Sequence, residues 1–183
     1  MQQRKTVTFT YNLIRAKRKT MSLRVSEDGV IEVRAPYRTA VATVDQFVED
    51  HKDWIRRQLA VSEKVRMLRP SYTEKEREDG KKRARAVIAA KCRFYAARMG
   101  VTYGTISIRE QKTRWGSCSS KGNLNFNWKL VLMPEEILDY VVVHELALRR
   151  EMNHGPAFWK IVESVLPDCR ARKEWLRKNG KLY

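Results

Sequence analysis

The first part of the chain alternates apolar and polar positions in short runs, a pattern that predicts β-strands. Val7–Ile14 is rich in β-branched and aromatic residues. Met21–Val25 and Val30–Val33 alternate on either side of Glu27-Asp28-Gly29, a turn signal. Two alternating runs around such a turn predict a hairpin. We expect this sheet to end at Pro36, which has no backbone N–H to donate.

From about residue 41 the apolar residues recur every three or four positions, which predicts helices. The first helix is expected over residues 41–68, with Thr43 as its N-cap and a break at Arg69-Pro70-Ser71. The second is expected over residues 73–99, from Thr73 as N-cap to Gly100 as stop. Gly80 is a candidate interruption of the second helix. The side chains predicted to face inward from its second half include Val87, Ile88, Phe94 and Tyr95.

Residues 101–132 return to strand patterns, and the rest of the chain reads as helices. Because strands and helices do not alternate regularly, the predicted class is α+β. We expect a single domain over 1–183, made of an N-terminal strand and helix region (1–69) and a core (70–183). The predicted strands are Thr105–Ile108, Arg114–Ser117 and Leu124–Leu132, and the predicted helices run from Pro134 to about Met152, from Gly155-Pro156 to Pro167, and near Cys169–Lys178.

Charge adds a hint about partners. The 183 residues include 38 Lys and Arg against 21 Asp and Glu, a formal charge of +17. An excess of this size suits an anionic partner such as nucleic acid, a phosphorylated ligand or a membrane surface, and it also serves solubility alone. The positive charge is spread along the chain, with local concentrations at Arg15–Lys19, Lys81–Arg85 and Cys169–Lys178.

Composition excludes several classes of protein. No apolar run approaches the ~18 residues of a membrane span, and the first residues lead into no apolar signal segment. The three cysteines, Cys92, Cys118 and Cys169, form no Cys-x-x-Cys pair, which argues against zinc-finger and thioredoxin sites. Free thiols fit a reducing compartment. We therefore expect a cytoplasmic protein without a membrane partner.

The candidate chemistry lies around two of the three histidines. His144 and Glu145 follow the apolar segment 137–143, so the sequence places an ionisable pair at the end of a buried helix. A His-Glu pair of this kind begins the H-E-x-x-H motif of zinc hydrolases, in which the histidines bind the metal and the glutamate is the general base. The second histidine of that motif would stand at position 148, where this chain has Leu148. His154 is placed as a downstream ligand if the helix ends nearby.

Several stretches along the chain are together much more specific than a lone His-Glu pair. They are Lys17–Arg34, Trp54–Gln58, Arg114–Ser119, Leu124–Leu130, Val143–Ala147, Asn153-His154 and Phe158-Trp159. In these stretches the chain resembles the YgjP-like metallopeptidases, relatives of the SprT and WLM domain proteases, and the resemblance covers nearly its whole length.

The resemblance implies a zincin-like metallopeptidase fold with an N-terminal β-hairpin region and a central active-site helix. It implies that zinc is held by His144 and His154, that Glu145 is the catalytic base, and that the substrate is a protein or peptide. Because Leu148 cannot donate a ligand, weak or absent zinc occupancy and impaired turnover are expected. The resemblance also places a strand beside the site, with Arg114, Trp115, Gly116 and Ser117 as substrate-binding residues for an extended peptide.

Several alternatives stay open from the sequence. Glu151 is a candidate substitute for the missing ligand, and otherwise a solvated or ion-paired residue. If no metal binds, His144 and His154 are structural histidines. The sequence favours Trp115 and Trp128 as core aromatics over substrate contacts. Leu148 is either natural, in a degenerate enzyme, or a substitution in an otherwise active one. The rival function is an inactive, basic, nucleic-acid-associated module on the same fold, and a third possibility is a protease that acts on nucleic-acid-bound proteins.

Overall fold

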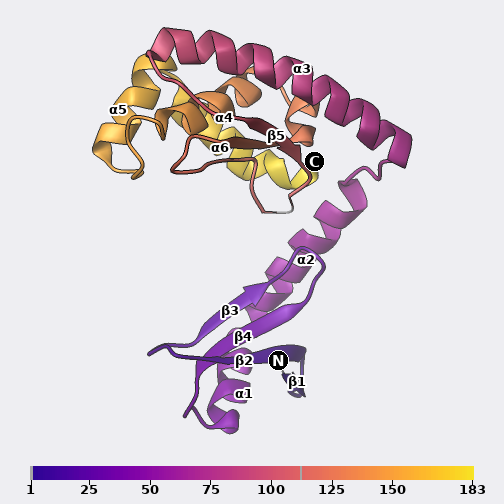
Figure 1. Cartoon of the computed structure of the whole chain (residues 1–183). Helices are drawn as coiled ribbons and strands as arrows, with labels where there is room; N and C mark the ends of the chain where they lie inside the picture. The colour runs from indigo at the N-terminus through magenta and orange to yellow at the C-terminus, as the bar shows by residue number, and fades with distance from the viewer. Residues whose placement is uncertain (1, 112) are drawn as a thin grey trace. The chain divides into compact units, whose positions relative to one another are not determined.

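The computed structural model describes residues 2–111 and 113–183 and confirms the α+β class. The chain divides into two compact units, with the boundary between Arg69 and Pro70. Figure 1 shows the elements of each unit along the chain. No helix in the described part is both long and apolar enough to cross a membrane.

The N-terminal unit contains a four-stranded sheet in the order β1-β2-β4-β3. The hairpin predicted around Glu27-Asp28-Gly29 is confirmed, because β3 and β4 pair antiparallel and Gly29 adopts φ +77° in the turn. The strand predicted over Val7–Ile14 is wrong in its first half, where Thr6 and Phe9 close a turn and Thr8 bonds to Glu49. The strands are β1 (Gln2–Lys5), β2 (Thr10–Ala16), β3 (Ser22–Val25) and β4 (Ile31–Pro36).

Two helices cover one face of this sheet. The predicted helix 41–68 is divided at His51 into α1 (Val41–Asp50) and α2 (Lys52–Leu68). Thr43 is not the N-cap, because the helix begins at Val41 after Ala40. Every second residue of β2 and β4 packs against one face of α1 and α2 to form the apolar core of this unit. Its members are Tyr11, Leu13, Ile31, Val33, Ala35, Val44, Val48 and Ile55.

The C-terminal unit begins with the long helix α3 (Glu74–Met99), which follows the prediction closely. Thr73 and Glu76 form a reciprocal capping box, and Gly100 ends the helix at φ +63°. Gly80 does not interrupt the helix. A Cβ at Gly80 would lie 2.4 Å from a ring carbon of Trp128, so this glycine permits a close approach of α3 to a buried indole. Phe94, expected to face inward, is exposed.

A three-stranded sheet and further helices complete this unit. The sheet order is β5-β7-β6, so β6 is an edge strand antiparallel to β7. The strand predicted over Leu124–Leu132 is wrong beyond Asn127, whose side chain accepts from the Lys129 N–H and starts a 3₁₀ turn. The elements are β5 (Ile106–Arg109), β6 (Gly116–Cys118), β7 (Leu124–Asn127), η1 (Trp128–Leu132), α4 (Glu135–Ala147), α5 (Pro156–Val165), α6 (Cys169–Asn179) and η2 (Gly180–Leu182).

The helix that carries the His-Glu pair is shorter than predicted. It was expected to reach about Met152, but α4 ends at Ala147. The following residues form a turn instead of continuing the helix. The Arg149 N–H donates to the Leu146 carbonyl, and the N–H groups of Arg150 and Glu151 both donate to the Ala147 carbonyl. Arg149 also donates from Nε to the Thr102 carbonyl at 3.0 Å. This contact lies 47 residues away in the sequence, so local periodicity did not reveal it.

Substituting Gly80 tests the close packing of α3 on Trp128. Alanine normally favours a helix over glycine by up to ~1 kcal/mol, but here its Cβ would strike a fully buried ring. We expect Gly80→Ala to lower the free energy of unfolding by about 1–3 kcal/mol, measured by urea denaturation. Gly155→Ala, with no atom within 4 Å of the added Cβ, is the control and should change it by less than about 0.5–1 kcal/mol. Equal effects would contradict the packing explanation.

Candidate functional site

The site forms where the last turn of α4 meets the segment that leads into α5. The Nε2 atoms of His144 and His154 are 3.0 Å apart. Their rings are nearly parallel, at 25°, with centroids 5.0 Å apart. The structure therefore brings together the two histidines that the sequence selected. The third histidine, His51, lies in the N-terminal unit and donates from Nδ1 to the Phe47 carbonyl.

His144 is enclosed by aromatic rings. The ring centroids of Tyr140, Phe158 and Trp159 lie 5.9, 4.9 and 6.0 Å from that of His144. Burial, followed by the neighbouring charges of His154 and Lys173, lowers the pKa of His144 to about 4. The imidazole is therefore neutral at pH 7, the form that binds metals. Its Nδ1 is buried without a hydrogen-bond partner among the described residues.

Among the described Asp, Glu, His, Lys and Arg residues of the chain, Glu145 is the one that is buried, with 5% of its surface exposed. Burial raises the pKa of its carboxyl to about 7, although Arg114 acts to lower it. A Cβ on Gly116 of β6 would lie 2.6 Å from Glu145 Oε1. The edge strand can approach the carboxylate this closely because residue 116 is a glycine. Oε2 has no hydrogen-bond partner within the described part of the chain.

Leu148 occupies the position one turn beyond His144. It caps the C-terminal end of α4 with helical dihedral angles (φ −62°, ψ −15°), and it is buried, with 7% of the residue's surface exposed. Residues four apart on a helix lie on the same face. A hydrocarbon side chain therefore stands where the H-E-x-x-H pattern would supply a nitrogen.

The two histidines fit a zinc ion, but the set of ligands is incomplete. Nitrogens 2.0–2.1 Å from a tetrahedral zinc are about 3.3 Å apart, close to the 3.0 Å between the two Nε2 atoms. Catalytic zinc sites use three protein ligands. Over residues 2–111 and 113–183, no three His, Cys, Asp or Glu side chains gather into a metal site. The Glu151 carboxylate instead accepts from the Asn153 N–H at 3.3 Å.

The segment expected to bind substrate lies at the site, with different surroundings for each residue. Gly116 touches Glu145, and the Arg114 charge acts on the same carboxyl. Trp115 packs on the core beside Gly180, and Ser117 Oγ accepts from Asn125 Nδ2 at 3.3 Å. Trp128 is fully buried, which confirms it as a core aromatic. The roles of Arg114, Trp115, Gly116 and Ser117 in substrate binding stay predictions.

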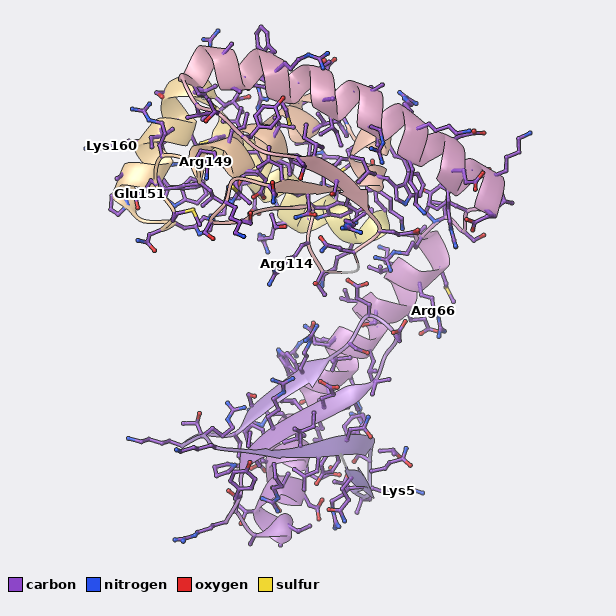
Figure 2. All side chains as sticks on the ribbon, in the orientation of Figure 1. Lys5, Arg66, Arg114, Arg149, Glu151 and Lys160 are labelled. Atoms are coloured by element: carbon purple, nitrogen blue, oxygen red, sulfur yellow. The ribbon has the colours of Figure 1, made fainter. Side chains whose placement is uncertain are left out.

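Two basic residues near the site were missed from the sequence. The Lys173 Nζ lies 4.2 Å from the Trp159 ring centroid, and its charge contributes to the low pKa of His144. Arg149 donates to the carbonyls of Thr102 and Ser120 and so ties the end of α4 to two loops. Figure 2 labels Arg149 with Arg114 and Glu151 on this unit. Neither Lys173 nor Arg149 has a spacing signal, because all of these contacts join distant parts of the chain.

Comparison with known proteins identifies a matching family and two solved structures to which the chain is similar. A family model described as "YgjP-like, metallopeptidase domain" matches residues 19–80 and 73–179. The chain is similar to the metallopeptidase zymogen of Pyrococcus abyssi abylysin (25% identity, TM-score 0.46, covering 52% of this chain and 94% of the other). It is also similar to the metallopeptidase zymogen of Methanocaldococcus jannaschii jannalysin (21% identity, TM-score 0.45, covering 50% and 94%). A search of curated proteins found no match.

The burial of Glu145 predicts a pH-dependent effect of its removal. A carboxyl with a raised folded-state pKa binds its proton more tightly in the folded protein. Between pH 4.5, the ordinary pKa of a glutamate, and about pH 7, the free energy of unfolding therefore falls as pH rises, and this loss is complete above about pH 7. Relative to the unsubstituted protein, Glu145→Gln should gain about 3 kcal/mol in going from pH 4 to pH 8.

Urea denaturation in EDTA at several pH values measures this difference. Both proteins retain His144, so its opposite pH dependence cancels in the comparison. Glu63→Gln, which removes an exposed carboxylate, is the matched control. A pH-independent difference between Glu145→Gln and the unsubstituted protein would show that the Glu145 carboxyl is not held protonated by burial.

Proposed function

The chain belongs to the YgjP-like family of metallopeptidase domains, and from this premise we propose that it is a zinc metallopeptidase-like protein whose hydrolysis of peptides is impaired by Leu148. One observation carries the proposal. Two imidazole nitrogens converge to 3.0 Å beside a buried glutamate, while the next helical turn offers only a hydrocarbon. Two candidate zinc ligands and a candidate base are thus present, and one zinc ligand is missing.

His144 and His154 are the residues that would hold zinc. When bound, zinc would polarise a water molecule and the carbonyl of the scissile peptide bond. Glu145 is the proposed base, because a carboxyl with a pKa of about 7 can both accept and release a proton near neutral pH. The aromatic rings around His144 keep bulk water from its buried side.

The edge strand β6 is the proposed binding surface for the substrate. Among the residues that the structure describes, β6 pairs on one side only, with β7. Main-chain hydrogen bonds from its free side would align an extended peptide alongside Glu145. Gly116 permits this by leaving no side chain between strand and carboxylate. Arg114, at the start of this segment, would favour acidic groups on the peptide.

Leu148 is proposed to act on metal affinity first and on turnover as a consequence. Removing a group that merely supports a metal ligand typically costs ~10–100-fold in affinity or activity. Loss of one of three ligands should cost more.

Restoring a nitrogen ligand tests the proposal. We expect Leu148→His to bind close to one zinc per chain, with an affinity at least ~100-fold above that of the unsubstituted protein, measured by metal analysis and by competition with a chromogenic chelator. Leu148→Met is the control, since it keeps an apolar side chain of similar size. Cleavage of a casein substrate should appear with Leu148→His alone.

A second substitution separates metal binding from catalysis. Leu148→His with Glu145→Gln should keep the zinc and lose cleavage, because the ligands remain and the base is gone. Leu148→His with His154→Ala should lose both. If Leu148→His folds but takes up no more zinc than Leu148→Met, the assignment of the ligands is wrong.

A further inference from the structure

The N-terminal unit has a concentration of positive charge at one end of its sheet. Strands β2 and β4 run parallel, so their C-terminal ends lie together, and β3 begins beside them with Ser22 paired to Arg34. We call the exposed cations at this end and on the adjoining outer face the basic sheet end. Its members are Lys17, Lys19, Arg24, Arg34 and Arg38.

The cations of the basic sheet end are not neutralised within the unit. Over residues 2–111 and 113–183, none of the five has a carboxylate oxygen within 4.0 Å. Elsewhere in the unit, Arg4 pairs with Asp45 at 3.4 Å and Arg56 with Asp53 at 3.7 Å. Most carboxylates of the unit lie on α1, α2 and the Glu27-Asp28 turn. Glu32 of β4 is the register partner of Arg24, but the two side chains form no ion pair within the described residues. The basic sheet end therefore carries five cations beside a single carboxylate.

Hydrogen bonds hold the backbone of this region in place. Arg15 Nη1 donates to the Pro36 carbonyl at 2.8 Å and so joins the ends of β2 and β4. Arg18 Nη1 donates to Ser22 Oγ at 2.7 Å across the turn before β3. The side chains of these two arginines therefore bond within the unit, whereas the five neighbouring cations are exposed. A surface ordered before binding loses less conformational entropy when a partner arrives.

An exposed aromatic ring adjoins these charges. Tyr37 follows the last residue of β4, precedes Arg38, and is 67% exposed. Among the exposed large hydrophobic side chains of the described residues, it alone belongs to the segments 15–24 and 34–38. Cations beside a single accessible ring match the way proteins hold single-stranded nucleic acid, with phosphates on the cations and a base stacked on the ring.

We propose that the basic sheet end binds the sugar–phosphate backbone of single-stranded nucleic acid, with Tyr37 as a stacking position for a base. Three of its five cations are arginines, whose planar guanidinium groups suit phosphate oxygens. A membrane surface is a poorer match, because stable attachment needs apolar side chains inserted beside the charges. This binding involves neither His144 nor Glu145, so it is independent of peptide hydrolysis.

Fluorescence anisotropy with the full chain and a labelled 20-nucleotide single strand tests the proposal. Lys17→Ala/Lys19→Ala/Arg38→Ala should weaken binding at least tenfold at low salt. Three fewer phosphate contacts should also reduce the slope of log affinity against log salt by about 2. Tyr37→Ala should weaken binding roughly tenfold through lost stacking, with little change in the salt slope.

The matched control removes three exposed cations from α2 of the same unit that form no ion pair within the described part of the chain. Arg57→Ala/Lys64→Ala/Arg66→Ala lowers the net charge equally, and Figure 2 labels Arg66 on that helix. It should retain binding within about twofold. Equal losses in both triple variants would overturn the proposal in favour of general charge attraction. Absence of single-strand binding by the unsubstituted chain would also overturn it. So would a Lys17→Ala/Lys19→Ala/Arg38→Ala variant that loses binding to phosphatidylserine vesicles or polyglutamate but not to the single strand. Zinc content measured on the same samples keeps this outcome separate from that of the metallopeptidase proposal.

Discussion

The constraint on which the C-terminal unit depends is an ionisable pair at the end of an apolar helix, a half-buried histidine followed by a buried glutamate. Eight other residues of α4 are buried, so the helix cannot turn His144 and Glu145 toward water without exposing its core face. The protein instead keeps both groups mostly neutral between about pH 4 and about pH 7. Burial moves their pKa values in opposite directions, to about 4 for His144 and about 7 for Glu145.

The surroundings of the pair follow from this constraint. Gly116 brings the backbone of β6 against the Glu145 carboxylate, where any side chain would collide with it. His154 returns from beyond the helix to place its Nε2 atom 3.0 Å from that of His144. Leu148 fits the apolar environment of α4 but adds no ligand. The same site is therefore well packed as a protein core and incomplete as a zinc centre.

The N-terminal unit has its own core and its own charge distribution. Its apolar residues lie between the sheet and the helices α1 and α2. Five exposed cations that form no ion pair within the described residues lie at and beside the ends of β2 and β4. The net charge of +17 was uninformative as a single number. It gains meaning once paired cations such as Arg4 are distinguished from unpaired ones such as Arg34.

Features decided by neighbouring residues were predictable from the sequence. The capping box of Thr73, the left-handed Gly100, the β3–β4 hairpin and the His-Glu pair each depend on a few adjacent positions. Features decided by distant contacts were not. The end of α4 at Ala147 coincides with Arg149 reaching Thr102, Gly80 is tolerated in α3 because of Trp128, and Lys173 acts on His144 from another helix. Local patterns specify backbone conformation, but only tertiary packing determines which distant side chains share a buried space and therefore which charges are neutral.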